Sequence, residues 1–154
     1  MKIICIVITI GILSAFTGCS DEENHENLTG IQQINYGTSF GECLGYCRKT
    51  IEITPAEIEF TKQGWEIDGQ LPDSTFQESI TSAEWNDLVE RIDIEEFLAL
   101  DTVIGCPDCA DGGAEWVEIV FDETKYKVTF EYFNAPEVMD PYIDSLRNYQ
   151  GSFD

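Results

Sequence analysis

The chain of 154 residues carries 30 acidic and 8 basic side chains, which gives a formal net charge of −22 at pH 7. Such a negative surface repels nucleic acids and anionic lipid headgroups, so we expect no nucleic-acid partner. The length fits one domain behind an N-terminal leader, and an aromatic content of 12% supplies the large side chains of a packed core.

Residues 1–18 have the features of a secretory signal peptide. Lys2 precedes an apolar run from Ile3 to Phe16, and small residues then lead to Cys19. The apolar run is shorter than the roughly 20 residues that a transmembrane helix needs, which disfavours a permanent membrane span. We expect cleavage before Cys19, which removes one basic and no acidic residue and changes the formal net charge from −22 to −23.

The segment Phe16-Thr17-Gly18-Cys19 resembles the lipobox of bacterial lipoproteins, with Phe16 in place of the usual Leu. The resemblance implies acylation at Cys19, and several acyl chains anchor a protein stably where one does not. Residues 19–30 are acidic and lack apolar periodicity, which predicts a flexible tether. This stretch also resembles the export signal of Bacteroidota surface lipoproteins. It implies a cell-envelope protein anchored to the outer membrane, either periplasmic or surface-exposed.

Residues 31–154 are predicted to form a single domain whose first half is rich in strands. Apolar and polar residues alternate weakly over 31–36 and more clearly over 50–64, with a bend at Pro55. Residues 65–80 predict a further hairpin around an Asp-Gly turn.

A helix is predicted to follow this hairpin. Thr81 and Glu84 match a capping box, and apolar side chains then recur at helical spacing. These side chains are Trp85, Leu88, Val89 and Ile92. A shorter apolar segment occupies residues 94–100.

The last part of the chain predicts a β-hairpin and a second helix. Residues 115–121 and 126–132 alternate cleanly around a short turn. The final helix is predicted to have Asp140 as its N-cap and Pro141 at its first position. Together, these elements predict an α+β fold: an antiparallel sheet with two helices packed on one face and cysteine-stapled loops.

Four cysteines follow the tether as two close pairs, Cys43 with Cys47 and Cys106 with Cys109. An even number of cysteines outside the cytoplasm favours disulfides. Four cysteines allow three connectivities, and we take the two local pairings as the simplest. Each closes only a small loop, so each is expected to stabilise the fold less than a long-range bridge would.

Two other chemistries remain open for these cysteines. The C-P-D-C sequence resembles the redox pair of thioredoxin-like proteins, but there the pair opens a helix, whereas Gly112, Gly113 and a predicted strand follow here. This alternative is an envelope thiol–disulfide oxidoreductase that uses Cys106 and Cys109. The other alternative is a zinc-stabilised domain with four cysteine ligands, which an oxidising compartment disfavours.

The second cysteine pair lies in an acidic loop without a recognised metal-binding spacing. Its carboxylates do not follow the EF-hand pattern, and we predict neither a metal nor a cofactor. We interpret the region as a candidate recognition loop formed by Asp108, Asp111, Glu115 and Trp116. No catalytic residue is predicted, because the one histidine, His25, lies in the tether and no carboxylate pair stands out.

The motifs FGECLGYC (40–47) and GCPDCADGGAEWVEI (105–119) resemble an uncharacterised family of bacterial lipoproteins of the Bacteroidota type. The resemblance covers residues 36–149 approximately and implies location and fold class, but no chemistry. We therefore expect a membrane-anchored extracytoplasmic lipoprotein. It would serve as a non-enzymatic binding or structural module with a protein or small-molecule partner.

Overall fold

The computed structural model describes residues 30–64, 71–122 and 124–153. Within these residues, seven strands form one sheet in the order β4-β3-β2-β1-β6-β7-β5, and all neighbours are antiparallel except β5 and β7. The strands are β1 (Gln33–Ser39), β2 (Tyr46–Ile53), β3 (Glu57–Gly64), β4 (Ser74–Ser79), β5 (Val103–Ile104), β6 (Ala114–Val120) and β7 (Lys125–Glu131).

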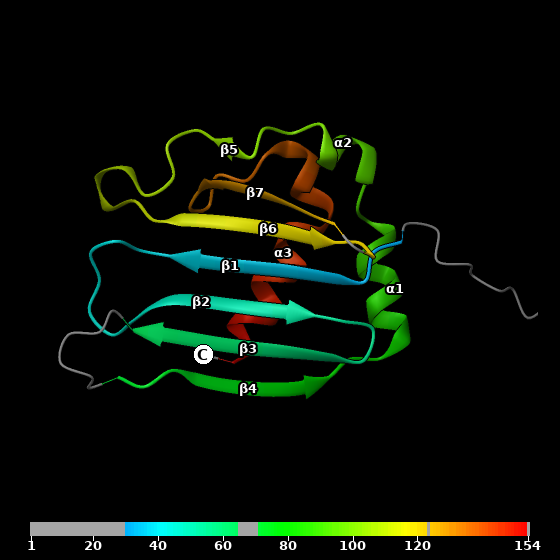
Figure 1. Ribbon diagram of the computed structural model, residues 1–154, viewed down its shortest axis with the longest axis horizontal. Helices are drawn as coiled ribbons and strands as arrows, with labels where there is room; N and C mark the ends of the chain where they lie inside the picture. Colours follow the sequence, from blue (N-terminus) through cyan, green and yellow to red (C-terminus); the bar gives the residue numbers. More distant parts are fainter. Residues whose placement is uncertain (1–29, 65–70, 123, 154) are drawn as a thin grey trace, which may run out of the picture.

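The described residues also form three α-helices, α1 (Ser82–Glu90), α2 (Ile94–Leu98) and α3 (Asp140–Gly151). In Figure 1, α3 runs behind the central strands and α1 lies at the end of the sheet that β4 leads into. The predicted α+β fold is confirmed, with α2 as an added five-residue helix from the apolar segment 94–100. None of these helices is long and apolar enough to cross a membrane.

Alternation along the strands gives the sheet one buried face and one polar face. On β1, Ile34 and Tyr36 are buried against the helices, whereas Asn35 between them contacts Glu118 on the opposite face. Side chains of all three helices complete the core beside the sheet. They include Trp85, Leu88, Phe97, Tyr142, Ile143 and Leu146. Burial of this apolar surface, at about 25 cal/mol per Å², is the main stabilising contribution.

The capping box predicted for α1 is confirmed. The Glu84 backbone N–H donates to Thr81 Oγ1 at 3.3 Å, and the Thr81 N–H donates to the Glu84 carboxylate at 2.9 Å. Two otherwise unpaired amides at the start of the helix are thereby satisfied, which fixes where α1 begins.

The predicted cap of the last helix is wrong by one residue. Asp140 is the first residue of α3, and Met139 occupies the N-cap without a side-chain capping bond. The reason is a 3₁₀ turn (Glu137–Met139) that delivers the chain to α3 in a helical conformation already. Pro141, predicted at the first helical position, is therefore at the second and still lies in the first turn of the helix.

The predicted strand pairs are present as antiparallel neighbours, β2 with β3 across the bend at Pro55 and β6 with β7. Strand β5 was not predicted, because two residues are too few to show an alternating pattern. The turn expected within residues 65–70 lies outside the described residues. So do the signal peptide, Cys19 and the tether up to residue 29.

Candidate functional site

Both cysteine pairs form local disulfides, as predicted. Cys43 bonds Cys47 with a Cα–Cα distance of 5.7 Å, and Cys106 bonds Cys109 with a Cα–Cα distance of 5.5 Å. The first bridge staples the loop of residues 40–45 to the start of β2, and the second staples the loop of residues 105–113.

The two stapled loops meet at one end of the sheet, at the left of Figure 1. The Gly41 N–H donates to Asp108 Oδ1 at 3.1 Å and so joins one loop to the other. Gly113 lies against the Phe40 ring so closely that a Cβ atom there would be 2.4 Å from a ring carbon. We call this region, residues 40–45 and 105–113 together with Phe133, the stapled end.

The backbone of the second loop is held in an unusual conformation. Asp108, Ala110 and Asp111 all have left-handed φ values, at 60°, 51° and 59°. This conformation is unfavourable for residues with a side chain, although Asp tolerates it better than most. The disulfide and the 3.0 Å bond from Asp108 N–H to Gly113 O restrain the loop in this conformation.

The surroundings of Cys106 and Cys109 differ from those of a thioredoxin-like pair. Cys109 begins a 3₁₀ turn of three residues, and β6 starts at Ala114, so no α-helix follows the pair. The helix N-terminus that lowers the pKa of an attacking thiol in that family is therefore missing here.

The metal alternatives find little geometric support in the described part of the chain. The four cysteine sulfurs are paired as two disulfides and do not converge as four thiolates. No group of three or more His, Cys, Asp and Glu side chains there could hold a metal ion.

Glu115, one of the candidate recognition residues, is fully buried beneath the stapled end. Its two oxygens form a bidentate ion pair with Arg147 of α3, at 2.8 Å to Nε and 3.0 Å to Nη2. The Tyr36 hydroxyl donates to the same carboxylate at 2.7 Å. A buried charge requires such pairing, so Glu115 supports the structure and presents no carboxylate at the surface.

The charges around Glu115 shift the pKa values of its partners. The hydrogen bond to Glu115 raises the pKa of Arg147 further above its ordinary range, against the opposing effect of burial. Burial first, and the Glu115 carboxylate second, raise the pKa of the Tyr36 phenol. Arg147 is therefore cationic and Tyr36 is a neutral hydrogen-bond donor throughout the physiological pH range.

The same network positions Phe133 at the surface. The Phe133 N–H donates to Glu115 Oε2 at 2.9 Å, and the Arg147 guanidinium lies 4.7 Å from the ring centre. Phe133 has a left-handed φ of 60° and remains 65% exposed. Glu115 and Arg147 thus hold an exposed aromatic ring in a strained backbone position.

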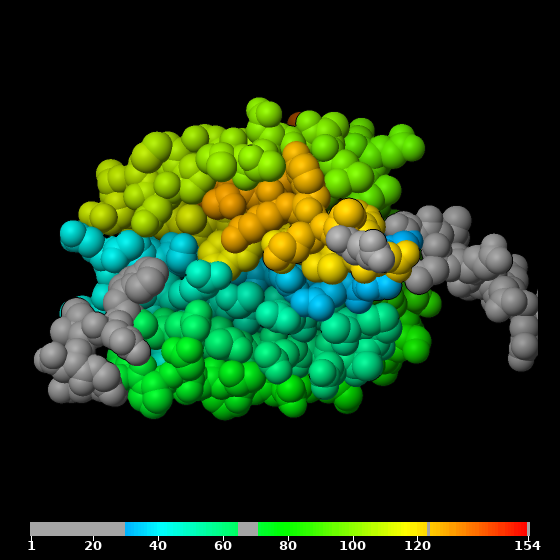
Figure 2. All heavy atoms as spheres, in the orientation of Figure 1, coloured from blue at the N-terminus to red at the C-terminus, as the bar shows by residue number. Residues whose placement is uncertain are grey.

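Trp116, the neighbouring candidate, lies on the polar face of the sheet, which faces the viewer in Figure 2. Its ring covers Gly37 on β1, and two cations lie against it, Arg48 at 5.0 Å and Lys127 at 4.4 Å from the ring centre. Only 5% of Trp116 is exposed, so its ring is not an exposed surface of the stapled end. Burial, and then the charge of Arg48, lower the pKa of Lys127.

Asp108 and Asp111 are exposed on the stapled end, as a recognition loop requires. Two exposed apolar residues there were missed, Leu44 at 97% and Phe133 at 65% exposed. The sequence did carry a signal for Leu44, an apolar residue inside a turn rich in Gly and Cys. Phe133 gave none, because its exposure depends on a distant ion pair.

Comparison with protein-family models and with curated protein sequences found no match to this chain. Fold and local geometry therefore carry the functional conclusion. They define a small α+β domain with a disulfide-stapled end.

Proposed function

We propose that this protein is a lipid-anchored module of the cell envelope that binds a protein or small-molecule partner through its stapled end, without catalysis. The observation that carries the proposal is the presentation of Leu44 and Phe133 on a rigid, disulfide-held surface. Exposed apolar side chains gain the most from burial by a partner, and a preorganised loop loses little entropy on binding.

The direction of the chain supports this assignment. The tether enters β1 at Gln33, and the first stapled loop leaves β1 after Ser39. A strand of this length separates its ends by about 20 Å. An anchor at Cys19 would therefore attach to the end of the domain opposite the stapled end, which would then point away from the membrane.

A second candidate function, a thiol–disulfide oxidoreductase, is favoured by one observation: Cys106 and Cys109 are both exposed on their loop. Such an enzyme needs a pair that exchanges readily with small thiols. A bond that resists reduction by glutathione would remove this candidate, whereas reproducible reductase activity of the purified protein would replace our main proposal.

The anchor is tested by Cys19→Ala. We expect this variant to lose the membrane association of the natural chain, because each buried CH₂ of an acyl chain contributes about 0.8 kcal/mol and the variant has no thiol to acylate. Membrane fractionation and intact mass measure the result. The natural protein should sediment with membranes and carry the mass of attached lipid, and a protein that sediments equally with and without Cys19 would contradict the proposal.

Binding through the stapled end is tested by Leu44→Ser. This side chain is almost fully exposed, so the fold should be unchanged while a partner's affinity falls by about tenfold or more, as for an apolar interface anchor. Envelope components captured by the mature protein are compared with those captured by the variant. Leu98→Ser, which changes a 44% exposed leucine on α2, is the matched control. Equal capture by all three proteins would contradict a binding role for this surface.

A further inference from the structure

We propose that the outer edge of β4 binds an extended basic segment of a partner protein as an added antiparallel strand, with a Lys or Arg side chain entering the acidic cavity beside Glu78. This interaction surface is separate from the stapled end. It does not depend on the function proposed above.

In the described part of the chain, strand β4 is the last strand on its side of the sheet and pairs with β3 alone. Its pairing is regular from Ser74 to Ser79 without a bulge, and five of its six residues are exposed. Natural proteins usually block such an edge with Lys or another charged side chain, Pro, a bulge or a very short strand. Strand β4 contains no Lys, Pro or bulge, and its one charged side chain is Glu78, which disfavours an acidic or apolar strand but pairs with a basic one. No described residue pairs with its outer edge.

The opposite edge of the sheet contrasts with this one. It ends in β5, which is only two residues long and pairs in parallel with β7. A strand that short offers too few free backbone groups to hold an added strand. Among the residues that the structure describes, one edge is therefore protected and the other is open over six residues.

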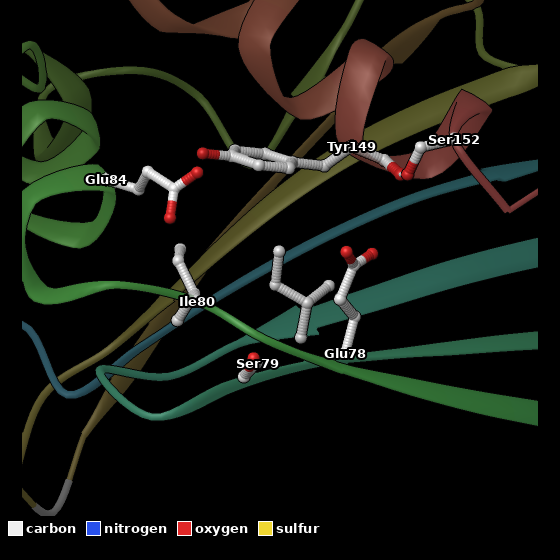
Figure 3. A pocket seen from close by; sticks show the side chains of 7 residues that line it. Glu78, Ser79, Ile80, Glu84, Tyr149 and Ser152 are labelled. Atoms are coloured by element: carbon white, nitrogen blue, oxygen red, sulfur yellow. The ribbon is translucent and has the colours of Figure 1, made fainter.

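A cavity of about 210 Å³ lies beside the open edge. It is lined by residues of β3, β4, α1 and α3, and by Ile80 and Ser152, which directly follow β4 and α3. Figure 3 shows the carboxylates of Glu78 and Glu84 and the ring of Tyr149 converging on this space from three elements. Ile58 and Ile80 form its apolar floor, which suits the aliphatic stem of a long basic side chain.

The charges around this cavity favour a cation. Glu78 has no hydrogen-bond or ion-pair partner among the described residues, whereas Glu84 is held by its capping bonds to Thr81. Those bonds lower the pKa of Glu84 and keep it ionised. Burial and the nearby Glu84 and Asp87 raise the pKa of Tyr149, so its hydroxyl stays neutral. The protein as a whole is also strongly acidic, which attracts a basic partner.

The side chains of β4 that face the helices define what the added strand carries. Glu78 and Phe76 are two positions apart and share this face. They pair across the ladder with the buried Ile58 and Phe60 of β3, respectively. Phe76 is 45% exposed, and Lys62 lies 5.3 Å from its ring on the side away from the cavity. A partner strand thus needs a basic residue beside Glu78 and an apolar residue two positions along beside Phe76, with no second cation near Lys62.

The test uses the mature protein in detergent micelles and a labelled capped peptide, Thr-Lys-Thr-Val-Thr-Ser-Thr. We expect saturable binding by fluorescence anisotropy and slower amide hydrogen exchange in residues 74–79. The same peptide with N-methylated backbone amides should not bind, because it cannot pair with an edge. A peptide with Glu in place of Lys should bind at least fivefold more weakly.

The matching protein variant is Glu78→Gln, which should weaken peptide binding about fivefold. Glu95→Gln on α2 makes the same charge change away from β4 and should leave binding unchanged. The proposal is overturned if the Lys peptide does not slow amide exchange in residues 74–79, or if the N-methylated peptide binds with the same affinity. It is also overturned if Glu78→Gln does not change the affinity for the Lys peptide. Dimers that form with rising protein concentration and slow amide exchange in residues 74–79 would also overturn the proposal. They would show that the edge of β4 pairs with a second copy of the chain.

Discussion

Arg147→Met is expected to destabilise the protein by about 3–5 kcal/mol, because it leaves the buried Glu115 carboxylate without its counter-charge. The Tyr36 hydroxyl and the Phe133 amide still donate to that carboxylate, but two neutral donors do not replace a bidentate cation. Methionine keeps much of the length and apolar stem of arginine, so the loss of charge dominates. Denaturant unfolding with intact disulfides measures the change.

Two further variants separate the buried ion pair from other effects. Asp144 also contacts Arg147, at 3.1 Å, but its side chain is 82% exposed, so Asp144→Asn should change the free energy of unfolding by less than about 1 kcal/mol. The double variant Glu115→Leu with Arg147→Met should be more stable than Arg147→Met alone, because no unpaired charge remains. A single variant as stable as the natural protein would show that Glu115 is not an essential buried charge.

Arg147→Met should also alter the stapled end. The guanidinium packs on the Phe133 ring, and Glu115 holds the Phe133 backbone in its left-handed conformation. Without the pair, Phe133 gains freedom to adopt an ordinary backbone conformation, so any partner that uses this ring should bind more weakly. This change couples a buried ion pair to the proposed recognition surface.

Local features of the sequence predicted the parts of the fold that depend on neighbouring residues. The capping box at Thr81 and Glu84 located α1, and the alternation around Pro55 located β2 and β3. The close spacing of the cysteines likewise predicted both disulfides. Each of these features involves residues a few positions apart, where spacing alone constrains geometry.

The sheet order and the support of the stapled end depend on distant residues and could not be predicted. Strand β1 lies between β2 and β6, which places Tyr36 beside Val117 across about half of the chain. The partner of Glu115 is Arg147, the only basic residue after Lys127, yet no local pattern links them. The acidic side chain at position 115 therefore looked like part of an exposed loop, although it begins a buried strand.

Trp116 illustrates the same limit on the polar face of the sheet. Alternation places its side chain opposite the buried Val117, which left open whether Trp116 is exposed or covered. Coverage by Arg48 of the distant strand β2 and by Lys127 of the neighbouring strand β7 decides this in favour of burial.

Gly37→Ala is expected to destabilise the protein by about 3 kcal/mol, because the new Cβ atom would lie 2.1 Å from a ring carbon of Trp116. An alanine in a strand is otherwise slightly favourable relative to glycine, so a loss of this size has to come from the ring. Any shift of the Trp116 ring also disturbs its contacts with Arg48 and Lys127. We expect the ring to lift from the surface of the sheet and to become more solvated.

Chemical denaturation and tryptophan fluorescence together test this displacement. Gly37→Ala should lower the free energy of unfolding and shift the tryptophan emission to longer wavelength, as a buried ring becomes exposed. Gly151→Ala is the matched control, because no atom lies within 4 Å of its added Cβ and alanine favours the end of α3. In a Trp116→Leu background, the alanine at position 37 should lose most of its effect. Equal destabilisation in both backgrounds would show that the clash is not with Trp116. Packing of the Trp116 ring on Gly37 would then not be what stabilises the polar face of the sheet.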